Sequence, residues 1–359
     1  MARTSTSSKC WDGPHTIDMR IGKPLAVFLL KVLISVLLVW LVLRKVDVDG
    51  IVSSLRQVSW WYVVGGMISF SFSVLALARR WQALSSGLLT FRQALKYTWI
   101  GLFYGAVLPG TFSGDVAKCA SLAIKHEQTR FVALPVSVVM DRCIGLYTLM
   151  MLFAVSCLML ALGMSGDSST LLSLGKNGFV YTLLLLLVCT IAALPRMRQL
   201  VGRAILRLPF VKIRETLWRF SDAAYNLLSQ PRIVVHAMWL SFLSHALNVA
   251  YTYFLIRALG VQMGAGSVFV FYSLLSVALI VSITYCGIGI RDVVSIGFFQ
   301  AISEQSPSGV AFSWLSVLVI LVMAGIGGIV LASELGDTKR HPSEWLGWCL
   351  RRARKGSAD

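Results

Sequence analysis

Long apolar runs, each about the length of a membrane-spanning helix, are the feature that most constrains how this chain folds. A bilayer core about 30 Å thick is crossed by a helix of roughly 20 apolar residues. Six runs reach that length, namely 25–43, 60–78, 132–163, 178–195, 233–257 and 310–333. Two further apolar stretches, 94–109 and 267–303, are shorter or interrupted. The sequence therefore predicts an all-α, polytopic integral membrane protein.

The composition excludes the other broad classes of protein. Of the 359 residues, 57% are hydrophobic and only 14% are charged, whereas a soluble domain carries roughly 25% charged residues. Disordered chains are poor in apolar residues, so disorder is excluded as well. A net charge of +17 would suit a nucleic-acid binder, but the apolar excess would not. We therefore expect no nucleic-acid partner.

The basic residues are concentrated in four segments that set the orientation. These segments are the tail 1–24, the segments 79–96 and 196–232, and the tail 336–359. Because Lys and Arg accumulate in cytoplasmic loops, we expect both tails in the cytoplasm and the domain 25–335 in the plasma (inner) membrane. Termini on one side require an even number of crossings, which six or eight crossings satisfy.

Six crossings fit if the stretches 94–130 and 267–309 each enter and leave the membrane on one side. The first of these re-entrant hairpins would then enter from the cytoplasm and the second from outside. Broken segments at corresponding positions of two halves are typical of transporters with an inverted repeat. The sequence thus predicts two broken hairpins related by an inverted repeat.

The basic segment 196–232 has an amphipathic pattern. Leu217, Phe220, Ala224 and Leu227 recur at helical spacing among basic residues. Such a helix is typical of the inner membrane surface, where anionic lipid attracts it. A solvated loop is the alternative interpretation.

The first polar cluster lies in the broken segment that reads PGTFSGDVAK. Pro109 ends a helix, and Gly114 allows a close backbone approach. Asp115 stands where a new helix would begin, with Lys118 three residues later on the same face. Asp115 could act only as an N-cap. The alternative is that the helix N-terminus and Lys118 together receive an anionic headgroup.

The second cluster is the pair Asp141 and Arg142 inside an apolar run. Ionisable residues at membrane depth are costly and mark functional sites by default. Adjacent residues do not face each other on a helix, so both need partners elsewhere. We expect Lys118 to pair with Asp141 and Asp115 to pair with Arg142. An ion-pair network that only fixes helix packing is the alternative.

The third cluster reads YCGIGIRD and covers residues 285–292. Gly287 and Gly289 free the backbone. Arg291 offers a planar set of donors suited to phosphate or carboxylate, and Asp292 follows it. An ordinary loop turn is the alternative interpretation.

Together the three clusters resemble the motifs of the flippase-like transmembrane family, which includes the membrane region of lysylphosphatidylglycerol synthases. The family motifs look like PGxxGGD, DRxxG and GGxGxRE, and this chain has PGTFSGD, DRCIG and CGIGIRD in the same order. The likeness covers most of residues 25–335. The departures from the family pattern are Ser113, Lys118, Cys286 and Asp292. Lys118 lacks the bidentate contact of an arginine, which affects headgroup preference.

The resemblance implies translocation of anionic, aminoacylated or polyprenyl-linked lipids between leaflets. The candidate substrate-binding residues are Gly114, Asp115, Lys118, Asp141, Arg142, Gly287, Gly289, Arg291 and Asp292. A non-catalytic membrane partner of a lipid- or glycan-modifying enzyme is an alternative, and a small-solute or ion transporter is another. The sequence does not determine the oligomeric state.

Catalytic and metal-binding motifs are missing from the sequence. It contains no HExxH, no GxSxG and no kinase signature. The seven cysteines include no CxxC pair, which argues against a zinc site or a disulfide framework. Only residues 334–359 follow the last predicted span. We therefore expect no enzymatic activity, no cofactor, no metal and no soluble synthase domain in this chain.

Overall fold

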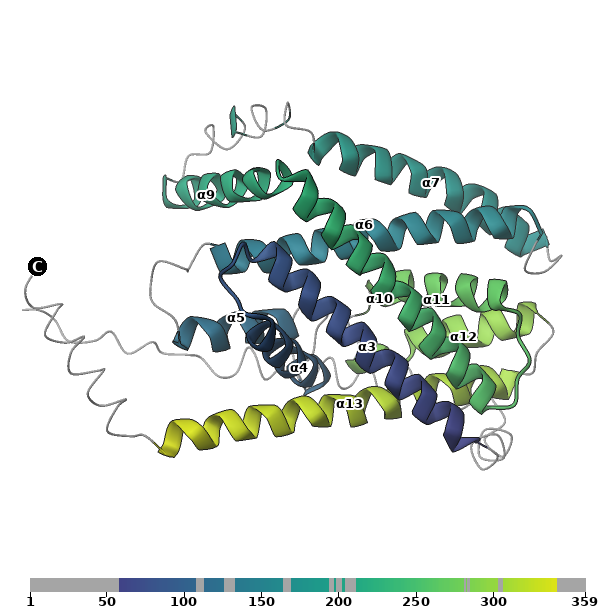
Figure 1. Cartoon of the computed structure of the whole chain (residues 1–359). Helices are drawn as coiled ribbons and strands as arrows, with labels where there is room; N and C mark the ends of the chain where they lie inside the picture. The colour runs from purple at the N-terminus through teal and green to yellow at the C-terminus, as the bar shows by residue number, and fades with distance from the viewer. Residues whose placement is uncertain are drawn as a thin grey trace, which may run out of the picture.

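The computed structural model describes residues 58–107, 113–125, 133–163, 169–193, 197, 202–203, 211–280, 282, 285–302 and 306–340. Every regular element among these residues is a helix (Figure 1). The helices are α3 (Trp60–Leu84), α4 (Phe91–Val107), α5 (Ser113–Lys125), α6 (Ala133–Ala161), α7 (Ser169–Ala193), α9 (Val211–Leu228), α10 (Pro231–Ala258), α11 (Ala265–Ile280), the short 3-10 helix η2 (Tyr285–Gly287), α12 (Ile290–Ala301) and α13 (Ser306–Arg340).

Within the described part of the chain, four helices are long and apolar enough to cross a membrane, and they confirm the all-α membrane fold. These spans are Trp60–Leu84, Leu134–Ala161, Pro231–Ala258 and Ser308–Ser333. Gly175–Ile191 and Ala265–Ile280 are shorter apolar helices. The apolar run 132–163 forms one continuous helix, α6, rather than a split pair. The predicted span 25–43 lies outside the described residues.

The first broken stretch is a helical hairpin that returns to the side from which it came. Its two arms, α4 and α5, pack against each other. The end of α3 and the start of α6 lie together, because the Trp81 indole Nε1 donates to Ser137 Oγ over 3.1 Å. The chain between them therefore leaves and returns on one side, as a re-entrant hairpin must.

The second broken stretch has the same plan at the opposite end of the molecule. Its arms α11 and α12 pack together and are joined through η2. Figure 1 shows α11 and α12 toward one end of the bundle and α4 and α5 toward the other. The two hairpins therefore enter the bundle from opposite ends.

The two halves form an inverted repeat, as predicted. The order long helix, two short helices, long helix occurs in α3–α6 and again in α10–α13. α4 packs on α13, and its counterpart α11 packs on α6. The equivalent helices α3 and α10 run antiparallel, because Ser59 N donates to Ala258 O (2.9 Å) and Ser69 Oγ donates to Leu247 O (2.7 Å). The second half is therefore inverted relative to the first.

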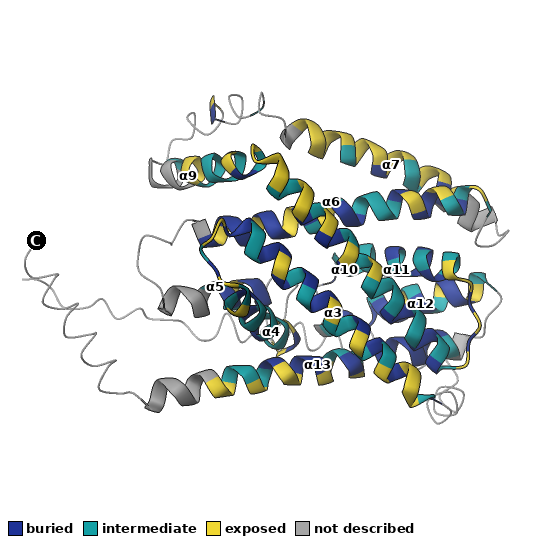
Figure 2. Cartoon of the chain, in the orientation of Figure 1, coloured by how far each residue is buried: buried dark blue, intermediate teal, exposed yellow. Residues whose placement is uncertain are grey.

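Small side chains let the central pair α3 and α10 approach closely. A Cβ on Gly65 would meet the Phe254 ring at 3.3 Å, and one on Gly66 would meet Leu255 at 3.5 Å. Small residues are typical of helix contacts within membranes, where no hydrophobic effect drives association. Large apolar side chains are instead exposed on the outer faces of α3, α7 and α10 (Figure 2). In a bilayer these faces contact lipid tails.

Helix α9 forms part of the basic segment 196–232 and packs against the bundle. Its apolar residues Phe220, Ala224 and Leu227 pack into a cluster with Met140 of α6 and Ala237 of α10. These apolar side chains therefore contact protein at the starts of α6 and α10, and the location of the segment on the inner membrane surface stays a prediction. Leu217 is exposed. The helix therefore covers the bundle with most of its apolar face.

Two glycines of α13 provide a test of the close contact between α13 and α4. A Cβ on Gly327 would collide with the carbonyl oxygen of Trp99, whereas one on Gly325 would meet nothing within 4 Å. We expect Gly327→Ala to lower the free energy of unfolding by about 1–3 kcal/mol, the usual cost of overpacking. Gly325→Ala should leave it unchanged or raise it by up to about 1 kcal/mol, because Ala favours a helix. Thermal unfolding in detergent measures both, and equal melting temperatures for the two variants would contradict the packing.

Candidate functional site

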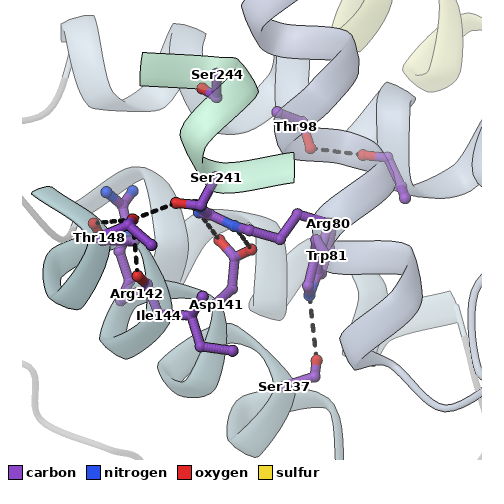
Figure 3. Close-up of polar contacts among 12 residues, drawn as sticks. Arg80, Trp81, Thr98, Ser137, Asp141, Arg142, Ile144, Thr148, Ser241 and Ser244 are labelled. Atoms are coloured by element: carbon purple, nitrogen blue, oxygen red, sulfur yellow. Dashed lines mark hydrogen bonds and ion pairs between the residues drawn. The ribbon is translucent and has the colours of Figure 1, made fainter. Parts of the chain in front are cut away.

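A buried ion pair joins three of the long helices. The Arg80 guanidinium, on α3, donates to both carboxylate oxygens of Asp141, on α6: Nε to Oδ1 over 2.7 Å and Nη2 to Oδ2 over 3.0 Å. Its Nη1 donates to Ser241 Oγ, on α10, over 2.8 Å. Figure 3 shows Arg80 reaching across to Asp141, with Ser241 beside the pair. One residue from each helix is thereby fixed to the other two.

Hydroxyl groups surround this ion pair and complete its hydrogen bonding. The Thr148 and Ser241 hydroxyls lie 2.5 Å apart, and Thr148 donates to the carbonyl oxygens of Ile144 and Gly145. The side chains of Arg80 and Asp141 are only 5% and 7% exposed. A buried pair tolerates such desolvation only when hydrogen bonds satisfy its remaining polar atoms. The network supplies those bonds.

A second charged group lies beside the first, at the start of α5. Asp115 binds two cations: Lys118 Nζ lies 2.8 Å from its Oδ1, and Arg142 Nε binds its Oδ2. Lys118 also stands over the Trp81 ring, 4.5 Å from the centroid. Since Trp81 and Arg80 are adjacent on α3, and Asp141 and Arg142 are adjacent on α6, the two groups form one cluster, which we call the α5 site.

Counted over its described residues, the α5 site has one positive charge more than it has negative charges. Its cations are Arg80, Lys118 and Arg142, and its carboxylates are Asp115 and Asp141, which is three against two. Asp115 and Lys118 are buried, but the Arg142 side chain is 46% exposed. The N-terminus of α5 adds a partial positive charge close to Asp115. The site is therefore electropositive, with an accessible guanidinium suited to a phosphate or carboxylate.

Glycine packing places α5 where these contacts can form. A Cβ on Gly114 would collide with the Gly101 carbonyl oxygen of α4 and would approach Gly105 N at 3.3 Å. A Cβ on Gly101 would meet the Gly114 carbonyl oxygen at 3.3 Å. Only glycine permits this separation of α4 and α5. Gly114 therefore belongs to the contact between α4 and α5 that sets the position of Asp115 and Lys118 in the bundle.

The third cluster forms a separate group at the start of α12, which we call the α12 site. Gly289 precedes the helix with φ 92°, and its N–H donates to Asp292 Oδ2 over 3.0 Å. Gly287 has φ 74°, a conformation that favours glycine. Arg291 Nη1 donates to Ser316 Oγ of α13 over 2.9 Å. Both glycines thus shape the turn from which Arg291 and Asp292 project.

Three buried polar atoms of the α12 site have no hydrogen-bond partner among the described residues. They are Arg291 Nε, Asp292 Oδ1 and Ser295 Oγ. Buried polar groups are nearly always paired, so each exception calls for a reason. Ser295 and Asp292 lie on one helix face, since they are three residues apart. In this conformation the α12 site is closed and incompletely paired, whereas the α5 site is paired and partly open.

The structure confirms one of the sequence predictions about these aspartates and arginines and changes two. Arg142 binds Asp115, which confirms that prediction. Asp141 was expected to bind Lys118, and that is wrong, because Arg80 takes both of its oxygens. Asp115 is the third residue of α5 rather than its N-cap. Its carboxylate binds two cations, Lys118 and Arg142. In α12, by contrast, Asp292 does cap the helix, because its Oδ2 accepts a hydrogen bond from the N–H of Gly289.

Arg80 is the functional candidate that the sequence did not reveal. It follows Arg79 directly after a predicted span, and both were interpreted as markers of the cytoplasmic side. Only the need of Asp141 for a cation could have suggested it. Ser241 and Trp81 gave no signal, since hydroxyls and aromatic rings are common in apolar helices. Among the described residues no group of three or more His, Cys, Asp or Glu side chains could hold a metal ion.

The adjacent arginines Arg79 and Arg80 provide a matched test of the ion pair. Arg80→Gln leaves the buried Asp141 without its cation, so we expect a loss of about 3–5 kcal/mol in the free energy of unfolding. Arg79 is exposed, and Arg79→Gln should change stability by less than about 1 kcal/mol. Thermal unfolding of the purified variants checks both values. The double variant Arg80→Met with Asp141→Leu should recover much of the loss, and no recovery would argue against an unpaired charge as its cause.

Comparison with known proteins agrees with this architecture. A family model described as the lysylphosphatidylglycerol synthase TM region matches residues 28–333, which includes both hairpins and both charged sites. A search of curated proteins found no match to the chain. Because the family model covers most of the chain, this membrane protein belongs to the lysylphosphatidylglycerol synthase transmembrane-region family.

Proposed function

We propose that this protein translocates lipids with a phosphate-containing headgroup between the leaflets of the plasma (inner) membrane. The observation that carries the proposal is the excess positive charge of the α5 site, with the Arg142 side chain 46% exposed. The family membership supports a role in membrane lipid chemistry. Anionic, aminoacylated and polyprenyl-linked lipids share the phosphate that a guanidinium recognises.

The chemistry needed is the movement of a charged headgroup past an apolar core. A charge in the bilayer centre is costly unless fixed groups pair with it. Arg142 and the N-terminus of α5 supply such groups at a helix break, while Asp115, which also binds Lys118, holds the guanidinium in place. The lipid tails would stay in the membrane as the headgroup moves along the protein. The proposal includes no catalytic step by this chain.

The inverted repeat supplies one charged site in each half of the chain, so that each site would serve one side of the membrane. The α5 site is partly open, and the α12 site, its counterpart in the second half, is closed with unpaired Arg291 and Asp292 atoms. Inverted halves can exchange conformations, which opens a central site to each side in turn. In the exchanged state the α11–α12 hairpin would present Arg291, and the α4–α5 hairpin would close over Arg142.

A flipping assay tests the role of Arg142. The full chain is reconstituted into vesicles with fluorescent phosphatidylglycerol, and a membrane-impermeant quencher reports lipid arriving in the other leaflet. We expect Arg142→Gln to slow flipping at least about tenfold, because a lost charge-assisted contact corresponds to about 1.5–3 kcal/mol. Arg219→Gln, an exposed arginine of α9, should flip lipid at the wild-type rate.

The other outcomes separate the alternatives. Equal flipping by wild type and Arg142→Gln, with both correctly folded, would exclude the α5 site as the headgroup path. No flipping by the purified chain, together with co-purification of a lipid- or glycan-modifying enzyme, would favour a membrane partner. Uptake of a small solute or ion without lipid flipping would favour a transporter of that cargo.

A further inference from the structure

A groove on the outer face of the bundle lies where the end of α3 meets the start of α10. One part, of about 450 Å³, is lined by residues of both helices that include Arg79, Gln82, Ser86 and His236. A second part, of about 530 Å³, continues along α10 past Arg232, Val235 and Trp239. His236 lines both parts. The two parts therefore form one surface with a polar end and an apolar end.

The polar end carries the Arg79 guanidinium, which two contacts hold in a fixed orientation. Arg79 Nη1 donates to Gln82 Oε1 over 2.7 Å, and its guanidinium lies 4.6 Å from the centroid of the Phe91 ring. These contacts fix the plane of the guanidinium, which reduces the entropy lost when it binds a phosphate. The described residues that line the groove include no Asp or Glu. An anion therefore meets no repulsion there.

The apolar end fits acyl chains. Val235 and Trp239 are 65% and 66% exposed, and they lie on one face of α10, because they are four residues apart. Trp is enriched at the membrane interface, where one end of its ring is apolar and the other wet. The basic segments at this end of the bundle place the groove at the cytoplasmic leaflet, which is rich in anionic lipid.

We infer that this groove binds an anionic glycerophospholipid of the cytoplasmic leaflet, with its phosphate at Arg79 and His236 and its acyl chains along Val235 and Trp239. This inference does not rest on the proposed function, because Arg79 points away from the α5 site that Arg80 enters. A lipid held here would contact both α3 and α10, the helices that Ser241 and Arg80 join inside the bundle.

Another occupant of such a groove would be the apolar segment 25–43 of the same chain. That segment contains Lys31 and no acidic residue; Arg44 and Lys45 follow it, and Asp47 and Asp49 come after them. It offers no negative charge to Arg79, His236 or Arg232. Charge complementarity therefore favours an anionic lipid over this segment.

Photo-crosslinking of the purified full chain in detergent tests the site. The probe is phosphatidylglycerol with a photoactivatable acyl chain, and mass spectrometry of peptides locates the adducts. We expect labelling within residues 231–239, with competition by unlabelled phosphatidylglycerol but not by phosphatidylcholine or glycerol phosphate. The double variant Arg79→Gln with His236→Gln should lower labelling at least about tenfold, because two contacts to the phosphate are lost. Arg219→Gln serves as the control and should label as the wild type does.

The inference is overturned by any of three results. Labelling by a phosphatidylcholine probe as strong as that by phosphatidylglycerol would remove the role of the charge. Unchanged labelling in the double variant would remove Arg79 and His236 from the site. Absence of adducts within 231–239 would show that something other than lipid, such as segment 25–43, covers the groove. Since Arg79 and His236 are exposed, equal melting temperatures of the variant and the wild type would confirm that folding is intact.

Discussion

The buried ion pair between Arg80 and Asp141 is the interaction on which the rest of this structure depends. It joins α3 to α6, and its bond to Ser241 adds α10. Each charge alone would be very costly at this depth, so the pair fixes the relative position of three helices that apolar packing alone would let slide. The position of α6 then brings Arg142 to Asp115. The neutral Arg80–Asp141 pair of the α5 site thus positions the group of Asp115, Lys118 and Arg142 that carries its excess positive charge.

Close backbone contacts supply the second constraint, because they decide where the helix breaks lie. Gly114 lets α5 press against α4, and Gly327 lets α13 press against the same helix from another direction. Backbone outside regular helices survives at membrane depth only within protein or beside a wet cavity. The hairpins satisfy this condition since the long helices pack around them. Their charged ends can therefore stand within the bundle.

The two halves share a plan but differ in chemistry. The first half carries Arg80, Lys118 and Arg142 around two carboxylates, whereas the second half carries Arg291 and Asp292 among serine hydroxyls. Asp115 at the start of α5 binds cations, whereas Asp292 at the start of α12 caps its helix. One half is consequently paired and partly open, and the other is closed with unpaired atoms. This asymmetry is what makes a change between two conformations physically plausible.

The sequence by itself determined the helical membrane fold, the two broken hairpins and their inverted relation, because apolar run length and basic loop charge act locally. It also indicated Asp115 as the partner of Arg142, since a charge in an apolar run requires an opposite one. Only the tertiary structure decided that Asp141 binds Arg80, that Gly114 is a packing residue, and that the apolar face of α9 contacts α6 and α10. Those outcomes depend on which helix faces which, and in an apolar solvent that choice rests on a few close contacts and buried charges far apart in the sequence.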